Sequence, residues 1–443
     1  MRKEFSKYVK NAYDIVCHAA NGIGPRLPGG ANEKQFADYM EEKMKGIGLK
    51  TRKEPFAVYP RASIGGIPFI GWISVGVSLM MYPARLWPFL WFPIAFFVIL
   101  SWAWIISSVF LYHTWFDRLF RQKKSQNVYG ELLPEDGKYD YTVILSGHTD
   151  TSWNWKHSER TYYNRKNNIW RGIIPIYIKV GFSAACYIVA SVISLFMTML
   201  YSGFFSWCKP VFQSRFFYPF SLVMLVLPVI TALGSVFLIQ WNDPKEEVAS
   251  PGAMDDATGV ALAYTVAEYY RDHPEKKPKN CRIVTLCTGS EEAGLRGSMA
   301  FAKEHRGEEI LQNAWNINID AIADDGYFEV VIKDDWQFTR FDKDLEQMFK
   351  DTFKELNIEN VKGRPAIHNP VGGCDSTPMT RAGIKSVTFA AQNPVLTYYY
   401  HTFRDRPERF TPETVGKGFE VILGVIDKIG KFQEEHGYNG VNH

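Results

Sequence analysis

The stretch Thr288-Gly-Ser-Glu-Glu-Ala-Gly-Leu-Arg-Gly-Ser298 decides the fold because of the segment that precedes it. Cys281–Cys287 is an apolar run rich in β-branched side chains, which predicts a buried strand of a parallel sheet. Glu291 and Glu292 therefore follow the carboxyl end of a strand, where open α/β sheets bind ligands. In non-helical backbone they point differently, so one can hold a metal while the other transfers a proton. A Glu-Glu pair alone is more often a solvated surface pair, so the other residues of the chain must decide whether this pair is functional.

The composition narrows the class of protein. A chain of 443 residues is long enough for two or more domains, or for one large domain with insertions. The formal net charge of +3 gives no electrostatic argument for nucleic-acid binding. The six cysteines show no paired metal-ligand spacing, which favours a reducing compartment. The segment Met1–Lys10 is too charged for a signal peptide.

Four long runs contain no Lys, Arg, Asp or Glu, and each is long enough for a helix to cross a bilayer, which takes roughly 20 residues. The runs are Ala62–Ala84, Leu86–Phe116, Val180–Cys208 and Phe216–Trp241. Trp and Tyr side chains near their ends suit the membrane interface. Four buried helices of a soluble protein are the alternative, but such runs are hard to bury in a soluble core. We therefore predict two transmembrane helical hairpins, at residues 62–116 and 173–241.

The rest of the chain alternates between predicted strands and helices, which is typical of an α/β domain with a mostly parallel central sheet flanked by helices. Strands are predicted at Lys50–Val58, Asn127–Leu133, Tyr141–Ser146, Cys281–Cys287, Trp315–Ile319, Gly326–Lys333 and Ser386–Ala391. Helices are predicted at Phe5–Gly22, Asn32–Gly48, Ala257–His273, Ser298–His305, Asp342–Leu356 and from Pro412 to about Glu435. This domain would consist of residues 1–61, 117–172 and 242–443, interrupted by the two hairpins.

Five potential metal ligands fall at predicted strand ends or in adjoining loops: His148, Asp255, Glu292, Asp320 and His401. Each has a simpler explanation when taken alone, since Asp255 or Asp256 can cap the following helix and His148 can merely bond to a nearby Asp. Together, two imidazoles and three carboxylates suit two zinc ions that share one carboxylate, each with an open position for water. Oxygen and nitrogen ligands without cysteine also fit cobalt or manganese.

Five motifs in this order resemble those of the co-catalytic di-zinc aminopeptidases, the leucyl aminopeptidase-like and aminopeptidase Y-like enzymes of metallopeptidase clan MH. The motifs are Gly147-His-Thr-Asp150, Gly252-Ala-Met-Asp-Asp-Ala-Thr-Gly259, Glu291-Glu-Ala-Gly-Leu-Arg-Gly-Ser298, Asn318-Ile-Asp320 and His401-Thr-Phe-Arg-Asp405. The resemblance covers about residues 1–60, 125–155 and 245–440, and implies a zinc-exopeptidase fold and metalloaminopeptidase activity on peptides. The hairpins have no counterpart in the secreted members.

The resemblance also implies a role for each ligand. Asp255 would bridge both metals. Glu292 and His401 would complete one site, and His148 and Asp320 the other. The three carboxylates and a hydroxide would then balance two divalent cations.

Two further residues receive roles from the resemblance. Asp150 would orient His148 through its second ring nitrogen. Glu291 would be the general base that takes a proton from the two-metal-activated water and passes it to the leaving amine. The peptide bond Asp255–Asp256 would be cis. One departure is Cys374-Asp-Ser376, where family members commonly carry Ser-Asp-His, and His368 is the candidate for the oxyanion-stabilising residue, which has no clear match.

Several alternatives remain within and outside this chemistry. A carboxypeptidase or dipeptidase would use the same ligands, although no obvious pair of carboxylate-binding arginines appears. A glutaminyl-cyclase-like acyltransferase would use one zinc ion. A non-catalytic membrane scaffold of the same fold would have lost its metal, whereas all five ligands and Glu291 are present here.

The charges near the hairpins predict their orientation. Positive residues on the peptidase side are Arg61, Arg118, Arg121, Lys123, Lys124, Arg165, Lys166, Arg171 and Lys245. The hairpin tips carry only Arg85, Lys209 and Arg215. The positive-inside rule therefore predicts an integral membrane protein with four transmembrane helices and a cytoplasmic peptidase domain.

Overall fold

The computed structural model describes residues 3–158, 170–204, 217–243, 245–360, 363–370, 372–393 and 399–436. The chain divides into two compact units. Unit 1 consists of Met1–Pro60, Asp117–Asn154 and Lys245–His443, and unit 2 of Arg61–Phe116 and Trp155–Pro244. Every candidate metal ligand therefore belongs to unit 1.

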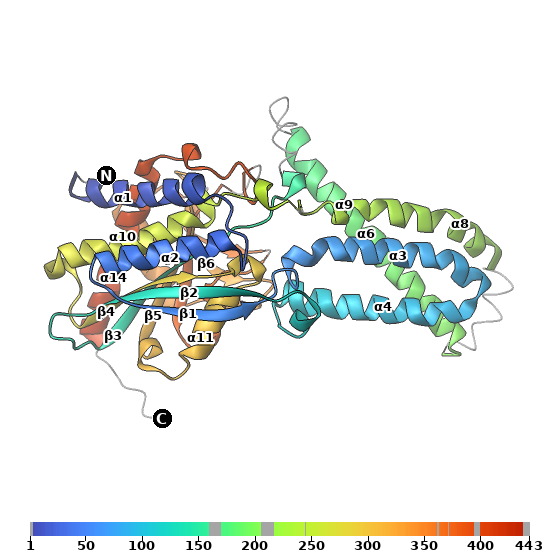
Figure 1. The fold of residues 1–443 in the computed structure, drawn as a ribbon, viewed down its shortest axis with the longest axis horizontal. Helices are drawn as coiled ribbons and strands as arrows, with labels where there is room; N and C mark the ends of the chain where they lie inside the picture. The colour runs from blue at the N-terminus through green and yellow to red at the C-terminus, as the bar shows by residue number, and fades with distance from the viewer. Residues whose placement is uncertain are drawn as a thin grey trace. The chain divides into compact units, whose positions relative to one another are not determined.

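Unit 1 is built on a nine-stranded sheet with the order β1-β2-β4-β3-β5-β9-β6-β7, in which β8 pairs with β6 (Figure 1). The strands are β1 (Lys50–Val58), β2 (Lys123–Leu132), β3 (Tyr141–His148), β4 (Cys281–Thr288), β5 (Ala314–Ile322), β6 (Phe328–Asp334), β7 (Thr339–Arg340), β8 (Ala366–Asn369) and β9 (Lys385–Ala391). The centre, β4-β3-β5-β9, is parallel. The pairs β1–β2, β2–β4, β6–β9 and β6–β7 are antiparallel. The sheet is therefore mixed, and the prediction of a mostly parallel sheet holds only for its centre.

The central strands are buried on both faces because alternate side chains enter two separate cores. In β4, Ile283 and Cys287 enter the first core, and Val284 and Leu286 enter the second. Helices that contribute to the first core are α1 (Ser6–Cys17), α2 (Ala31–Gly46), α10 (Thr258–Asp272), α12 (Lys343–Glu355) and α14 (Pro412–His436). Those of the second core are α11 (Arg296–Glu304) and α13 (Ser376–Arg381). This two-sided burial explains the continuous apolar run at Cys281–Cys287.

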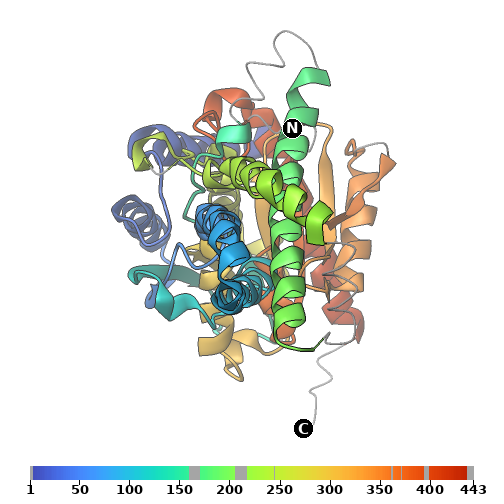
Figure 2. The ribbon, with the colours of Figure 1, turned by 90° about the vertical axis from the view of Figure 1, so that its right-hand side faces the viewer.

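Unit 2 contains four helical segments that are long and apolar enough to cross a membrane: Ile64–Leu86, Pro88–Phe110, Lys179–Tyr201 and Pro219–Ile239. They comprise the helices α3 (Ile67–Leu86), α4 (Trp91–Trp104), α6 (Trp170–Tyr201), α8 (Phe217–Gly234) and α9 (Val236–Ile239). Within this unit α3 packs against α8 and α4 against α6 (Figure 2). The residues Arg165, Lys166, Cys208, Lys209 and Arg215, on which predictions were based, lie outside the described residues.

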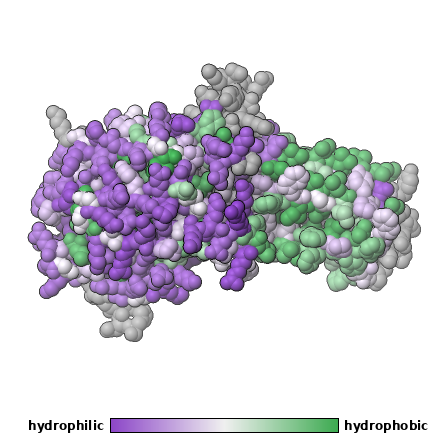
Figure 3. Space-filling model, in the orientation of Figure 1, coloured by the Kyte–Doolittle hydropathy of each residue, from purple (hydrophilic) through white to green (hydrophobic). Residues whose placement is uncertain are grey.

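In unit 2, polar side chains lie between the helices and large apolar side chains lie on the outside. Buried hydroxyls pair between helices: Ser74 Oγ lies 2.5 Å from Ser235 Oγ, and Thr231 Oγ1 donates to Ser78 Oγ at 2.8 Å. The outward side chains of α3, α4 and α8 are large and apolar, and the visible face of these helices is mostly green in Figure 3. Helices that pair hydroxyls inside and expose apolar side chains outside are suited to lipid rather than water.

Gly259 allows α10 to begin directly against β5. A Cβ atom there would lie 2.1 Å from Ile319 O and 2.4 Å from Asp256 Oδ2. Because backbone atoms cannot move aside cheaply, we expect Gly259→Ala to lower the free energy of unfolding by on the order of 2–3 kcal/mol. Urea unfolding of the full chain in detergent measures this. Gly46→Ala is the control, since its Cβ would meet nothing within 4 Å; equal midpoints for the two variants would contradict the prediction.

Candidate metal centre

The five candidate ligands come from separate segments of unit 1. His148 is the last residue of β3, Asp320 lies within β5, and Glu292 follows β4. Asp255 lies in the turn Ala253–Ala257 before α10, and His401 in the loop between β9 and α14. The carboxyl ends of parallel strands form one edge of a sheet, which brings such residues together.

A bulge sets the direction of Asp320, which the sequence analysis placed at the end of its strand. The register between β5 and β9 shifts between Ile319 and Ile322, and Ala321 has a φ of 63°. A bulge redirects side chains next to it. Asp320 is therefore presented from within the strand rather than from the loop that follows.

Asp255 faces two histidines with its two carboxylate oxygens. Its Oδ1 lies 2.9 Å from Nε2 of His148, and its Oδ2 lies 2.9 Å from Nε2 of His401. The same nitrogen of His401 lies 3.0 Å from Oε1 of Glu292. All four side chains are buried. Asp255 therefore occupies the position expected of a carboxylate shared by two metal sites.

Two groups of three side chains have ligand atoms within 4.8 Å of one another: Asp255, Glu292 and His401, and His148, Asp256 and Asp320. The second group contains Asp256 where the sequence resemblance implies Asp255. However, Asp256 Oδ2 accepts the backbone N–H of His148 at 3.0 Å, and Oδ1 accepts that of Gly259 at 2.9 Å. We therefore retain Asp255 as the candidate ligand and assign Asp256 to holding the backbone.

The donor set fits divalent cations. Imidazole and carboxylate are the ligands that zinc takes in hydrolytic sites. Oε1 of Glu292 is buried and faces Nε2 of His401 at 3.0 Å. Burial, and then the charge of Asp255, raise the pKa of Asp320 to about 7. A cation at this place would offset the repulsion among the carboxylates.

Asp150 has the position expected of a residue that orients His148. Nδ1 of His148 lies 3.3 Å from Oδ1 of Asp150 and 3.1 Å from its backbone oxygen. The sequence did not indicate its second contact: the carboxylate accepts the backbone N–H groups of Glu291 at 2.9 Å and Glu292 at 3.0 Å. Asp150 thus ties the end of β3 to the turn that carries both glutamates.

Asp405 holds the turn of the candidate bridging residue. Its carboxylate accepts the N–H groups of Met254 at 2.9 Å and Asp255 at 3.1 Å. Asp405 belongs to the motif His401-Thr-Phe-Arg-Asp405, but nothing in the sequence shows which backbone it contacts. The peptide bond Asp255–Asp256 is cis, as predicted.

Glu291 is half-buried beside these ligands. Burial raises its pKa well above the usual value, and the charges of Glu292 and Asp375 add to the shift, while His148 opposes it.

The segment Cys374-Asp-Ser376, which differs from the Ser-Asp-His that family members commonly carry, contains a residue with a structural role. Asp375 is buried and accepts hydrogen bonds from Thr288 Oγ1 at 2.6 Å and Ser298 Oγ at 2.5 Å. It therefore supports both ends of the loop that carries the glutamates. His368, the candidate for oxyanion stabilisation, lies on β8 with its side chain 53% exposed and its Nδ1 3.5 Å from Asp335 Oδ1. The interaction found for His368 is thus with a surface carboxylate.

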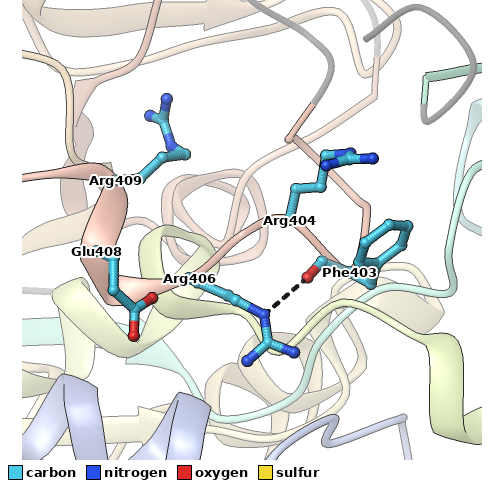
Figure 4. Close-up of a pocket in the computed structure, with 5 residues that line it drawn as sticks. All are labelled: Phe403, Arg404, Arg406, Glu408 and Arg409. Atoms are coloured by element: carbon cyan, nitrogen blue, oxygen red, sulfur yellow. Dashed lines mark hydrogen bonds between the residues drawn. The ribbon is translucent and has the colours of Figure 1, made fainter. Parts of the chain in front are cut away.

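A pocket of ≈ 320 Å³ lies in the segment after His401 and is lined by Phe403, Arg404, Arg406, Glu408 and Arg409 (Figure 4). Arg406 Nε donates to the backbone oxygen of Phe403 at 3.2 Å. Arg409 Nη2 pairs with Asp324 Oδ1 at 2.8 Å. None of the five candidate ligands lines this pocket, so it is not the candidate metal centre.

Comparison with known proteins agrees with this geometry. Residues 239–426 match the model of peptidase family M28. The matched segment contains Asp255, Glu291, Glu292, Asp320 and His401, whereas His148 lies outside it. No curated protein matches the chain.

Solved structures of aminopeptidases share the fold at low sequence identity. BSAP, a zinc aminopeptidase from Bacillus subtilis, superposes with a TM-score of 0.53 at 13% identity, covering 95% of each chain. An aminopeptidase from an Aneurinibacillus species gives 0.51 at 12% identity, covering 96% of this chain and 93% of that one. A leucine aminopeptidase precursor from Bacteroides thetaiotaomicron gives 0.50 at 13% identity, covering 94% and 97%. These likenesses show an α/β fold with a central sheet flanked by helices, as in zinc exopeptidases.

Substitution of the two neighbouring aspartates of the turn should have different effects on metal binding and on stability. Asp255→Asn removes a charged oxygen from between two histidines, so we expect zinc bound to the purified chain to fall below one ion. Asp256→Asn turns an amide NH₂ toward a backbone donor, so the free energy of unfolding should fall by roughly 1–3 kcal/mol while folded protein keeps its zinc. Elemental analysis and urea unfolding measure both effects. Zinc lost only from Asp256→Asn would reverse the assignment.

Proposed function

We propose that this protein is a membrane-anchored zinc metallopeptidase of family M28 that hydrolyses N-terminal residues from peptides. The observation that carries the proposal is Asp255, whose two oxygens each lie 2.9 Å from a different histidine, with Glu292 3.0 Å from one of them. The family match over residues 239–426 supports it. A surface cluster of acidic residues would lack this shared geometry and its burial.

The ligands divide into two sets. His148 and Asp320 would hold one zinc ion, Glu292 and His401 the other, and Asp255 both. The bound ions would polarise the scissile carbonyl and lower the pKa of a water molecule. Cobalt or manganese would satisfy the same donors.

Glu291 would transfer a proton from the attacking water to the leaving amine. Its backbone N–H is held by Asp150 at 2.9 Å, which fixes the turn and leaves the Glu291 carboxylate to act. Glu291 would take a proton from the attacking water and deliver it to the leaving amine. The carboxylates of Glu292 and Asp320 would attract a free α-amine, which favours aminopeptidase action over carboxypeptidase action.

The four apolar segments of unit 2 would anchor the chain in a lipid bilayer. Their outward side chains are apolar and their hydroxyls pair inside the bundle, which supports this assignment. We further propose that the peptidase unit faces the cytoplasm, from the positive charges that flank the spans.

Cysteine labelling tests the orientation. Cys17 and Cys208 are first replaced by serine to remove background. Asn442→Cys, in the C-terminal tail, should then react with an impermeant maleimide only after cells are permeabilised. Leu86→Cys, at the end of α3 and exposed, is the matched position and should react in intact cells. Labelling of Asn442→Cys in intact cells would overturn the cytoplasmic placement.

The two glutamates after β4 separate proton transfer from metal binding. Glu291→Gln leaves every ligand in place, so two zinc ions should remain while kcat falls by roughly 10²–10⁴-fold. Glu292→Gln removes a ligand, so zinc affinity should fall and excess zinc should partly restore activity. Elemental analysis beside kinetics on aminoacyl fluorogenic amides distinguishes the two. Near-normal turnover of Glu291→Gln would mean that the roles are assigned wrongly.

The same assays, applied to the wild-type protein, distinguish the possible reaction classes. Two zinc ions and release of N-terminal residues are the expected result. One zinc ion with cyclisation of an N-terminal glutamine would identify an acyltransferase instead. A folded, metal-free and inactive chain would identify a scaffold.

A further inference from the structure

Arg26 lies on the segment that leads into α2 and Glu33 lies in the first turn of α2. Both are almost completely buried, with 0% and 1% of their surface exposed. Their segment lies outside the residues that match the family model. Charged side chains are rarely buried to this extent without a specific partner. The contacts of Arg26 and Glu33 therefore indicate the role of each buried side chain.

The guanidinium of Arg26 joins the loops that carry two candidate ligands. Its Nε donates to the backbone oxygen of Thr149 at 2.8 Å, between His148 and Asp150. Its terminal nitrogens donate to the backbone oxygens of Pro251 at 2.6 Å and Gly252 at 2.9 Å, just before the Asp255 turn. Further contacts reach the backbone oxygens of Ala19 and Gly24. One planar fork thus holds three chain segments that are distant in sequence.

Among the residues that the structure describes, Arg26 forms no direct ion pair, and nearby carboxylates compensate its charge. Burial lowers its pKa to about 10, and the nearby carboxylates of Asp405 and Asp150 oppose that shift. Arg26 therefore keeps its proton at neutral pH. A permanent positive charge behind the candidate ligands lowers the repulsion among the carboxylates, and its rigid geometry suits the backbone oxygens better than a lysine would.

Glu33 holds the loop after β4, which carries Glu291 and Glu292. Its Oε1 accepts hydrogen bonds from Ser290 Oγ at 2.8 Å and Ser125 Oγ at 2.9 Å, and its Oε2 accepts the N–H of Gly29 at 2.7 Å. Ser290 directly precedes the two glutamates and adopts a φ of 55°. A non-glycine residue in this region needs outside support. Glu33 supplies that support through the Ser290 hydroxyl.

We propose that Arg26 and Glu33 are positioning residues that fix the ligand loops of the metal centre. Arg26 acts through the backbone next to His148 and Asp255, and Glu33 acts through Ser290. The inference rests on the proposed function for the identity of the metal, but the contacts themselves do not depend on it. Replacing residues that orient metal ligands typically costs 10–100-fold in metal affinity or activity.

Arg282 offers a matched control for Arg26. It is also buried in unit 1, and its guanidinium bonds to Glu131 at 3.2 Å and Thr142 at 3.1 Å. It lies at the amino end of β4, roughly 20 Å along the strand from Thr288. Loss of Arg282 should therefore reduce stability without altering the metal centre.

The experiment compares Arg26→Met with Arg282→Met in the full chain in detergent. Both should lower the urea midpoint. Only Arg26→Met should weaken zinc binding, by roughly 10–100-fold in competition with a chelator, and change the visible absorption bands of the cobalt-loaded protein, which report ligand geometry. Arg26→Lys keeps the charge but loses the planar fork, so we expect an intermediate loss of affinity. It replaces Arg26→Met if that variant does not fold.

Glu33→Gln and Ser290→Ala test the second contact, with Glu346→Gln on α12 as the control carboxylate. Both test variants should weaken zinc binding several-fold and shift the cobalt bands, whereas the control should change neither. The double variant should lose no more affinity than the larger single loss, since both changes break one contact. Wild-type zinc affinity and cobalt bands in folded Arg26 and Glu33 variants would overturn the proposal. Absence of zinc from the wild-type protein would instead contradict the proposed function.

Discussion

The candidate centre depends on carboxylates that hold the backbone of the ligands without being ligands themselves. Asp256 accepts the N–H of His148, Asp150 accepts that of Glu292, and Asp405 accepts that of Asp255. A hydrogen bond to a charged group contributes roughly 1.5–3 kcal/mol. Because each carboxylate lies on a different loop from the backbone that it binds, the loops are cross-linked. Loss of one contact therefore lowers the stability of both loops that it joins.

The same cross-linking explains how unit 1 tolerates two long insertions. The chain leaves the unit after Pro60 and again after Asn154, and returns each time at a connection between strands. The entropy of closing a loop grows only slowly with its length, so long insertions at such points cost little. The strands β3 and β4 come from different segments of unit 1, yet their ends are joined: Thr288 Oγ1 donates to Gly147 O at 3.2 Å, and Thr149 Oγ1 donates to Thr288 O at 3.0 Å. Stability of the site therefore depends on tertiary contacts rather than on chain continuity.

The sequence predicted the helices and strands whose burial produces a regular pattern of apolar residues. β1 was predicted with its observed bounds, and β4 and β9 within one residue, because apolar or alternating runs mark them. β7, β8 and α13 were missed, since elements of two to six residues carry no periodic signal. The antiparallel edges were missed because periodicity does not encode strand order. The candidate ligands were recognisable as motifs, whereas the contacts of Arg26 with Thr149 and of Glu33 with Ser290 join residues 123 and 257 positions apart.

The charges around His401 would affect how the candidate centre binds a cation. Burial alone would lower the pKa of His401, but Glu292 and Asp255 raise it to about 10. Nε2 of His401 lies 2.9 Å from Asp255 Oδ2 and 3.0 Å from Glu292 Oε1. Because a histidine must be deprotonated to bind a metal, the raised pKa of His401 would make metal affinity rise with pH up to that pKa.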